Sequence, residues 1–373
     1  MMSVPFFKKY VFFILCIFIT SCKPKNKVEK PSENKTKSSI THALGFNLIK
    51  ENNQTTLIIK TPYPNAKETF TYSLGAENTD IKTPINKIVV TSTTHIPVLE
   101  LLGKEKTLIG FPHTKYVSSE KTRALIDSGF VRELGKEQSL NTEVLLDIKP
   151  DLVVGFSMGK TNKTLNRVKN AGIPVIINGD WLEETPLGRA EWVKVFGALY
   201  NKSEKADSLF NAIKNNYLEA IEIAKKATKQ PTILSGAIMS KDIWNLPAGE
   251  SFVAQYLKDA NLDYLWKNTK GKGSLSLSFE SILDKGKEAD FWIAPGYFSS
   301  KEQMLNSNKH YAEFKAFKND KIYSPALKKG KTGGVLYFEL APTRPDLVLK
   351  DVIKITHPEL LPNYKLTFFE RVK

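Results

Sequence analysis

The chain has 373 residues, of which 54 are lysine or arginine and 39 are aspartate or glutamate, so its formal net charge is +15. Only 6 of the 54 basic residues are arginine, and no dense basic block occurs. This composition argues against nucleic acid as a partner, because base and phosphate recognition favours the bidentate arginine fork. The length suggests two lobes or domains.

The chain begins with the pattern of a secretory signal. Lys8 and Lys9 precede an apolar run over 10–19, and small residues then lead to Cys22. The run is shorter than the roughly 20 residues that a permanent membrane span needs. The cysteine and the four residues before it resemble a bacterial lipobox, which implies a signal peptide over 1–21 and lipid on Cys22. We therefore expect a lipid-anchored, extracytoplasmic protein on the periplasmic face of the cell envelope.

Two segments of different character follow the expected anchor. Residues 22–43 are rich in lysine and hold few large apolar side chains, so we expect a flexible spacer. Residues 44–85 alternate apolar and polar side chains around turn residues. This pattern predicts a β-hairpin or meander at the edge of the first lobe.

Short β-branched runs then alternate with longer amphipathic stretches. Such runs occur at 88–90, 108–111, 152–154 and 175–177, and again at 232–234, 291–293 and 321–323. Continuous apolar strands separated by helices are typical of a parallel sheet covered on both faces. The sequence therefore predicts an α/β fold with an N-terminal lobe over 86–202 and a C-terminal lobe, including a C-terminal helix, over 230–373.

The longest helical pattern lies between these halves, at 203–229. Ser203 is suited to cap its start, and Pro231 follows its end. Apolar side chains recur there at three- and four-residue spacing. A helix of about 25 residues within this range reaches roughly 38 Å at about 1.5 Å per residue, about the breadth of two small lobes. We expect this helix to join the lobes; a surface helix confined to one lobe is the alternative.

Each half also contains a similar phrase. A glutamate, Glu143 or Glu280, is followed by leucine at the third position and aspartate at the fourth. A short helix is then expected to end, and Asp151 or Asp290 opens a buried strand. Two such phrases, one in each half, suggest two lobes built on a common plan.

These phrases, the linker at 184–197 and the ending at 344–360 resemble the ABC-importer substrate-binding lipoproteins for iron–siderophore complexes and cobalamin. The likeness covers about residues 86–358. It implies two Rossmann-like lobes with parallel sheets, joined by one long α-helix that permits little closure. It further implies a permease and an ATPase as partners, with Glu143 and Glu280 docking into arginine pockets of the permease. We expect a monomer.

The ligand is expected between the lobes, where loops leave the carboxyl ends of the strands. Aromatic faces suit chelate rings or a corrin, and a cation could face ligand oxygens. The predicted ligand-binding residues are Tyr116, Phe156, Met158, Trp181, Trp244, Tyr297, Tyr337 and Arg344. The chain is expected to hold no resident cofactor. A ferric siderophore or other anionic metal chelate fits the basic surface best, and cobalamin is the second choice.

Other functions stay open at this point. A zinc- or manganese-binding transport protein would need convergent His, Asp or Glu side chains. Among five histidines, only His95 and His113 follow neighbouring predicted strands, and we predict no metal site. No His-Glu-x-x-His or Gly-x-Gly-x-x-Gly motif occurs, and we expect no enzymatic activity. A surface lipoprotein that captures its ligand without a permease is a further alternative.

Overall fold

A computed structural model describes residues 40–51 and 54–373 of the chain. The expected signal peptide, the expected lipidation site Cys22 and most of the expected spacer lie outside the described residues. Within the described part of the chain, no helix combines the length and the apolar character that a membrane crossing requires.

The N-lobe is built on a five-stranded parallel sheet with the order β11-β10-β5-β6-β7. Four of its strands are the apolar runs of the sequence, because β-branched side chains there are buried on both faces of the sheet. The strands are β5 (Ile88–Val90), β6 (Leu108–Phe111), β7 (Arg132–Glu133), β10 (Leu152–Gly155) and β11 (Val175–Ile177). The helices are α1 (Ile96–Leu102), α2 (Glu120–Asp127), α3 (Thr142–Ile148), α4 (Lys163–Asn170), α5 (Pro186–Glu191) and α6 (Val193–Leu199).

The C-lobe repeats this plan with the order β15-β12-β17-β18-β19, in which only the edge strand β19 is antiparallel. Its strands are β12 (Thr232–Ser235), β15 (Asp263–Tyr264), β17 (Phe291–Ile293), β18 (Ile322–Ser324) and β19 (Glu370–Arg371). A small antiparallel sheet holds β13 (Ala237–Ser240), β14 (Ile243–Pro247) and β16 (Ser274–Ser278). The helices are α8 (Phe252–Asp259), α9 (Phe279–Gly286), α10 (Lys301–Ser307), α11 (Lys315–Lys318), α12 (Leu336–Leu340) and α13 (Pro345–Thr356).

Several short elements complete the two lobes. The pair β8 (Gly135–Lys136) and β9 (Ser139–Leu140) forms a small hairpin in the N-lobe. The 3-10 turns are η1 (Thr93–His95), η2 (Glu105–Thr107), η3 (Thr114–Tyr116), η4 (Asp180–Leu182), η5 (Lys309–Glu313) and η6 (Pro358–Leu360).

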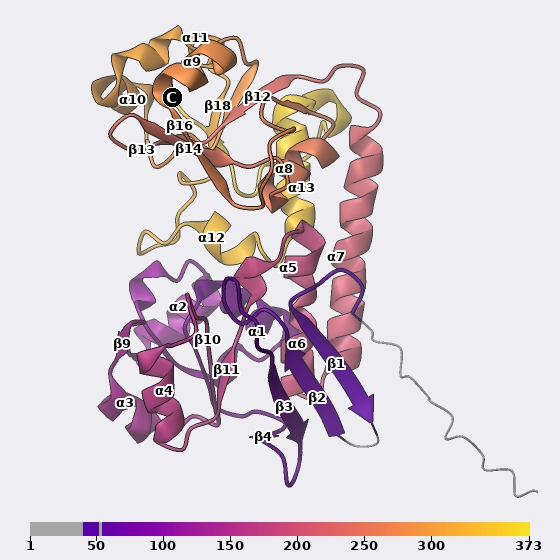
Figure 1. The fold of residues 1–373 in the computed structure, drawn as a ribbon, viewed down its shortest axis with the longest axis vertical. Helices are drawn as coiled ribbons and strands as arrows, with labels where there is room; N and C mark the ends of the chain where they lie inside the picture. Colours follow the sequence, from indigo (N-terminus) through magenta and orange to yellow (C-terminus); the bar gives the residue numbers. More distant parts are fainter. Residues whose placement is uncertain (1–39, 52–53) are drawn as a thin grey trace, which may run out of the picture. The chain divides into compact units, whose positions relative to one another are not determined.

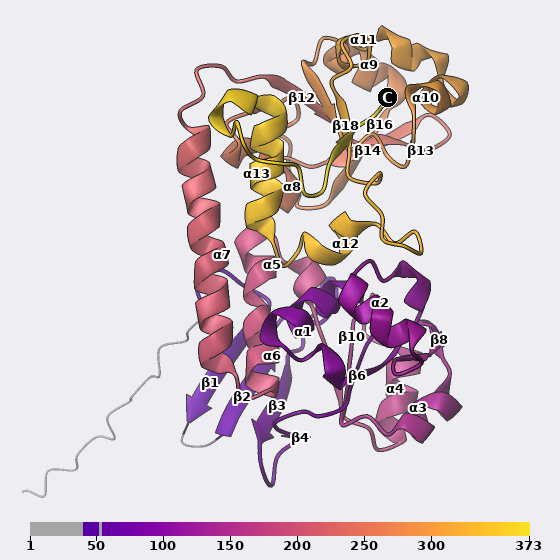
Figure 2. The same cartoon turned by 180° about the vertical axis from the view of Figure 1, so that it is seen from behind.

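Helix α7 (Ser203–Ala224) runs alongside both lobes (Figures 1 and 2). Its first half contributes buried side chains such as Phe210 and Ile213 to the N-lobe core. Its second half contributes Tyr217 and Ala220 to the C-lobe core. The predicted fold class, two Rossmann-like lobes joined by one long α-helix, is therefore confirmed.

Two details of the helix prediction were wrong. Helix α7 ends at Ala224 rather than 229, because Ala224 is its last residue in the C-lobe core and Lys225 and Lys226 beyond it are exposed. Ser203 does not cap the helix: it is already the first helical residue, and Lys202 occupies the cap position without a side-chain hydrogen bond.

The segment before the N-lobe, where a β-hairpin or meander is expected, forms a four-stranded sheet. Its strands are β1 (Phe46–Glu51), β2 (Gln54–Ile59), β3 (Phe70–Gly75) and β4 (Ile81–Lys82), in the order β1-β2-β3-β4. The first three strands pair antiparallel, as in a meander, and β4 pairs parallel to β3.

Two buried carboxylates bind the segment of chain that leads into this sheet. Glu191, which is 0% exposed, accepts the backbone N–H groups of residues 41–43 at 2.7 to 3.1 Å. Glu183 accepts the N–H groups of Leu44 and Gly45 and the indole N–H of Trp192. Residues 41–43 are thus bound to the N-lobe. The expected flexible spacer over 22–43 was too long at this end, because composition gives no sign of such distant acceptors.

Replacing Glu191 by alanine should lower the free energy of unfolding by about 3 kcal/mol, because three backbone N–H groups lose their buried acceptor. Urea denaturation at pH 7 measures this loss. Burial raises the pKa of Glu191, but the N–H groups of residues 41–43 and Lys194 outweigh it and hold the pKa below its usual value. The contribution of Glu191 should therefore disappear as the pH falls through that lowered pKa.

The matched control is Glu51→Ala, which removes an exposed acid from β1. It should change the free energy of unfolding by less than about 0.5 kcal/mol. A loss below about 1 kcal/mol in Glu191→Ala would contradict the importance of these hydrogen bonds.

Candidate ligand-binding site

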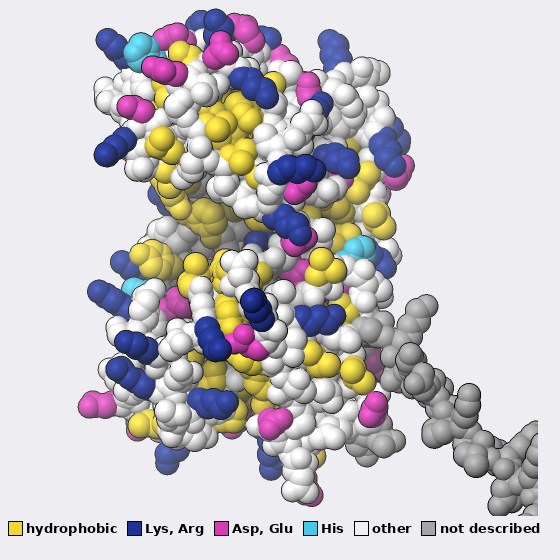
Figure 3. Space-filling view, in the orientation of Figure 1, with side chains coloured by type: hydrophobic (Ala, Val, Ile, Leu, Met, Phe, Trp, Pro, Cys, Tyr) yellow, Lys and Arg dark blue, Asp and Glu magenta, His cyan; other side chains and the backbone are white. Residues whose placement is uncertain are grey.

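The carboxyl ends of the N-lobe strands face the C-lobe across a cavity of about 590 Å³, which we call the ligand cavity. Parallel strands end at one edge of their sheet, so the loops that follow β5, β6 and β10 converge there. Those loops and the facing C-lobe segments supply Thr91, Ser92, Thr93, Phe111, Pro112, His113, Tyr116, Glu137, Phe156, Tyr297, Lys329, Gly333, Val335 and Phe338. On the face shown in Figure 3, apolar side chains gather in a hollow between the two lobes.

Exposed aromatic rings line the ligand cavity. Tyr116 is 52% exposed and Tyr297 is 65% exposed. The Tyr297 ring lies 6.3 Å from that of Phe338, centroid to centroid. Large exposed aromatic side chains are uncommon on a surface that binds nothing, and flat rings suit the faces of a chelate or a macrocycle.

His113 holds a strained position beside these rings. Its φ is +51°, in the left-handed region that a residue with a Cβ rarely adopts. The strain is fixed by its backbone N–H, which donates to Glu133 Oε1 at 3.0 Å and to the Gly135 carbonyl at 2.9 Å. The His113 ring in turn lies 5.6 Å from the Tyr116 ring. Strain of this kind often marks a functional site.

A segment of the C-lobe reaches across to the N-lobe, and we call residues 327–340 the strap. Thr332 Oγ1 donates to the Lys115 carbonyl at 2.7 Å. Glu339 accepts the N–H groups of Ser118 at 2.7 Å and Ser119 at 2.8 Å. Contact is so close at Gly334 that a Cβ there would lie 2.1 Å from the Tyr116 carbonyl oxygen. The strap therefore joins the lobes at a place separate from α7.

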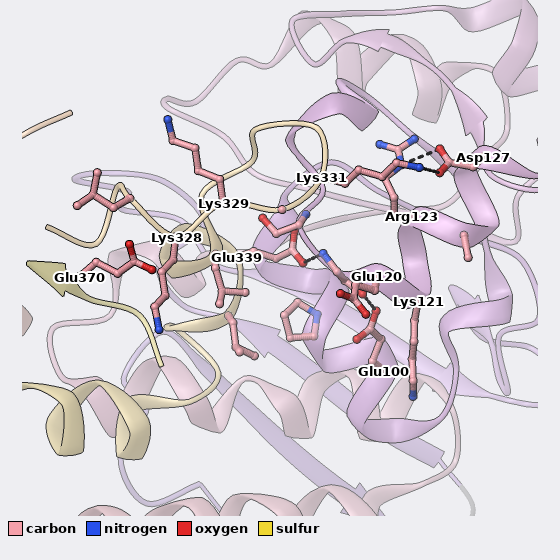
Figure 4. A pocket seen from close by; sticks show the side chains of 18 residues that line it. Glu100, Glu120, Lys121, Arg123, Asp127, Lys328, Lys329, Lys331, Glu339 and Glu370 are labelled. Carbon is pink, nitrogen blue, oxygen red and sulfur yellow. Dashed lines mark hydrogen bonds and ion pairs between the residues drawn. The ribbon is translucent and has the colours of Figure 1, made fainter. Parts of the chain in front are cut away.

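The strap also lines a second cavity of about 980 Å³ (Figure 4). Glu339 and Glu100 both lie in its wall, and Glu100 accepts hydrogen bonds from the Ser119 and Thr122 hydroxyls. Burial raises the pKa of Glu339 to about 7, against the lowering effect of the two backbone N–H groups, and nearby Glu100 raises it further. This carboxyl is thus poised to change its charge near neutral pH.

Three of the eight predicted ligand residues, Tyr116, Phe156 and Tyr297, come together in the ligand cavity. Tyr337 lines an adjoining apolar pocket of about 250 Å³ that shares Tyr297 and Phe338 with the ligand cavity. Trp181 packs against Phe156, with ring centroids 6.4 Å apart, without lining the cavity itself. Met158 is 69% exposed and also stays outside the residues that line it.

The structure places Trp244 and Arg344 outside the residues that line the ligand cavity, and the burial of Trp244 contradicts its predicted role. Trp244 is 0% exposed, because β14 turns it into the C-lobe core against Trp292, and its indole N–H donates to the Ser235 carbonyl. Arg344 forms a two-pronged ion pair with Asp346 at the start of α13, at 2.8 and 2.9 Å. The charge of Arg344 is therefore paired within the C-lobe.

Sequence analysis missed Glu137, Lys329 and Phe338 as cavity residues. Glu137 could have been suspected because it lies in a tight turn after the second strand. Lys329 and Phe338 gave no local signal, because they reach the ligand cavity only through the path of the strap.

A serine motif also escaped notice. Residues 155–159 read Gly-Phe-Ser-Met-Gly, the pattern of a nucleophile elbow. In such an elbow the serine stands exposed and is hydrogen-bonded to a histidine base. Here Ser157 is 4% exposed and its hydroxyl donates to the Gly159 carbonyl at 2.6 Å. Within residues 40–51 and 54–373, no histidine hydrogen-bonds to it.

The two glutamates of the repeated phrases occupy equivalent places, one on each lobe. Glu143 lies in the first turn of α3, which Asn141 caps, and Glu280 lies in the first turn of α9, which Ser278 caps. Both side chains are exposed. Neither has a hydrogen-bond or ion-pair partner among the described residues. They are therefore free to meet another molecule.

No group of three or more His, Cys, Asp or Glu side chains is placed to hold a metal ion in the part of the chain that the structure describes. His95, one of the two histidines near the predicted strands, is fully buried, and its Nε2 contacts the Asn178 amide at 2.9 Å. His113 lines the ligand cavity. The two histidines thus lie in different surroundings, His95 in the interior and His113 at the ligand cavity.

A family model described as periplasmic binding protein matches residues 88–325. The chain belongs to the periplasmic binding protein family. Members of this extracytoplasmic family are transport proteins that bind solutes and work with the permease and ATPase subunits of ABC transporters. The resemblance read from the sequence is thereby confirmed.

Individual relatives of the family agree with this assignment. An uncharacterized lipoprotein of Methanocaldococcus jannaschii is 27% identical over 317 residues, which cover 83% of this chain and 73% of the relative. A solved structure of a possible iron-binding, periplasmic solute-binding protein from Staphylococcus epidermidis has a TM-score of 0.58 at 20% identity, covering 74% of this chain and all of that one. An ABC-type Fe3+-hydroxamate transport protein from Saccharomonospora viridis has a TM-score of 0.55 at 13% identity, covering 77% and 96% of the two chains.

The Glu339→Gln variant should change how stability depends on pH. The pKa of Glu339 rises from 4.5 in the unfolded chain to about 7 in the folded protein, so its carboxylate form disfavours folding. Wild type should therefore lose stability relative to Glu339→Gln as the pH rises from 4.5 to 7, by up to about 3 kcal/mol. Urea denaturation at pH 5, 6, 7 and 8 measures the difference.

The control for this comparison is Glu120→Gln, which alters an exposed acid in the same cavity wall. Its stability should run parallel to that of wild type at every pH. If the stability of Glu339→Gln also ran parallel to that of wild type, Glu339 would not titrate between pH 5 and pH 8.

Proposed function

We propose that the protein captures a metal chelate of the iron–siderophore type in the ligand cavity and delivers it to the permease of an ABC importer. The observation that carries this proposal is the set of aromatic rings around one interlobe cavity: Tyr116, Tyr297 and Phe338, which are exposed, and Phe156, which is half-buried. A volume of about 590 Å³ lies within the usual range for sites that hold small organic ligands.

Two further observations support an iron chelate in particular. Structural neighbours are described as a possible iron-binding protein and as part of an Fe3+-hydroxamate transport system. The positive charge of Lys329 in the ligand cavity is also suited to the oxygen atoms of a chelate.

Delivery would use Glu143 and Glu280. One exposed carboxylate on each lobe makes a two-point contact with basic pockets of a permease, and this contact also fixes the orientation of the bound protein. Anchoring through a lipid on Cys22 would keep the protein at the membrane, and the description of a relative as a lipoprotein supports such an anchor.

Ligand binding is tested by tryptophan-fluorescence titration with a ferric trihydroxamate, haem and cobalamin. We expect saturable quenching by the ferric trihydroxamate, and we expect Phe156→Ala and Tyr297→Ala each to raise its Kd at least about tenfold, because each removes an apolar face of the cavity. The control is Phe130→Ala, which removes an aromatic ring that is 48% exposed outside the ligand cavity. An unchanged Kd in both cavity variants would locate binding elsewhere.

Docking is tested by uptake of radiolabelled iron into cells that express the importer. Glu143→Ala combined with Glu280→Ala should abolish uptake while the Kd for the chelate stays within about twofold. The matched control is Glu120→Ala combined with Glu302→Ala, which removes one exposed first-turn acid from each lobe. Normal uptake by the Glu143/Glu280 double variant would refute the assignment.

A further inference from the structure

One carboxyl group in the ligand cavity has no partner in the protein. Glu137 lies in the turn between β8 and β9 and is half-buried. It forms no hydrogen bond and no ion pair with any of the described residues. By contrast, the neighbouring acid Glu133 accepts N–H groups from His113, Thr114 and Gly135. Glu137 is also the one acid among the described side chains that line the ligand cavity.

An unpartnered, half-buried carboxylate is costly in an empty cavity. Removing it from water disfavours the charged form, and nothing in the protein compensates. The same burial raises the pKa of Glu137 to about 7. The natural compensation is a group supplied from inside the cavity, either a cation or a strong hydrogen-bond donor.

The opposite wall of the ligand cavity differs in charge. Lys329, on the strap, lines this cavity and has no ion-pair partner among the described residues. The cavity thus presents an unpaired acid from the N-lobe and an unpaired base from the C-lobe. An occupant that satisfies both walls carries positive charge at one end and oxygen ligands at the other.

We propose that Glu137 is a specificity-determining residue that selects metal chelates bearing a protonated amine. The ammonium group would lie against Glu137, while chelate oxygens face Lys329 and the chelate body packs on the aromatic rings. This inference rests on the proposed function, and it adds the chemical class of the chelate. A chelate with negative charge at the same end would be repelled by the ionised carboxyl group and bind less tightly.

Other groups near the cavity bear on any pH dependence. Among the described residues, the other titratable or charged side chains that line it or contact its lining are His113, Lys115, Tyr116 and Glu133 of the N-lobe and Tyr297 and Lys329 of the C-lobe. Burial raises the pKa of the Glu137 carboxyl group to about 7, so its charge changes near neutral pH. Below pH 7 it is protonated in the free protein, and an ammonium ligand must then drive off a proton to gain an ion pair. Preference for the amine-bearing chelate should therefore increase as the pH rises through 7.

The test compares two probes that differ at one nitrogen, a ferric trihydroxamate with a free terminal primary amine and its N-acetylated form. In full-length protein at pH 8, calorimetric titration should give an at least tenfold lower Kd for the amine form, and the ratio should shrink towards pH 6. The Glu137→Gln variant should bind the acetylated form with the same Kd as wild type. It should bind the amine form no more tightly than it binds the acetylated form. Glu77→Gln, which removes an exposed acid outside the cavity, should keep the wild-type ratio.

The outcomes separate the role of Glu137 from the proposed function. Equal Kd values for the two forms in wild type, with both weakened by Phe156→Ala, would overturn the role of Glu137 and leave the proposed function standing. A preference that persists unchanged in folded Glu137→Gln would also overturn it. Absence of binding by the two trihydroxamates, haem and cobalamin would instead overturn the proposed function, and this inference with it. The pH series in wild type gives its answer even if the variant fails to fold.

Discussion

Both lobes depend on one shared helix, because α7 is a structural part of two separate hydrophobic cores. Phe210 and Ile213 are buried in the N-lobe, and Tyr217 and Ala220 are buried in the C-lobe one turn further on. Tyr217 also donates its hydroxyl hydrogen to Asp259 of α8 at 2.6 Å. A large change in the angle between the lobes would have to bend this helix or expose one of its two apolar halves. The walls of the ligand cavity are therefore held near their final places before a ligand arrives, which limits the free energy spent on ordering them.

The strap adds a second junction with a different chemistry. Helix α7 binds the lobes through apolar packing, whereas the strap binds them through backbone hydrogen bonds to Thr332 and Glu339. The strap also lines both the ligand cavity and the second cavity, with Lys329 in both walls. The lining of the ligand cavity and the contact between the lobes therefore share one short segment.

The elements that depend on short-range patterns of apolar residues were predicted correctly from the sequence. The β-branched run at 152–154 became a buried central strand, and the stripe that contains Phe210 and Tyr217 became the connecting helix. These outcomes follow from short-range periodicity, which a single sequence displays fully. The repeated glutamate phrases likewise placed Glu143 and Glu280 in equivalent first turns.

Residues whose role depends on distant partners could not be read in this way. Trp244 looked like a ligand contact because aromatic side chains suit either a cavity or a core, and only the direction of β14 decides between them. Arg344 is a different case, because its ion-pair partner Asp346 is only two positions away and lay within reach of local analysis. The hydrogen bonds from residues 41–43 to Glu191 span about 150 positions, and the strap meets the N-lobe more than 200 positions away. Sequence spacing carries no information about such encounters.

The hold on residues 41–43 has a mechanical consequence for any force that is applied to the chain ahead of them. Any pull transmitted along the chain reaches the hydrogen bonds to Glu191 and Glu183 before it reaches β1. Those carboxylates lie on η4–α5 segments that belong to the N-lobe body, so drag is passed to the bulk of that lobe. The chain entry thus acts as a strain relief, because such a force would load the body of the N-lobe before it reached the edge sheet.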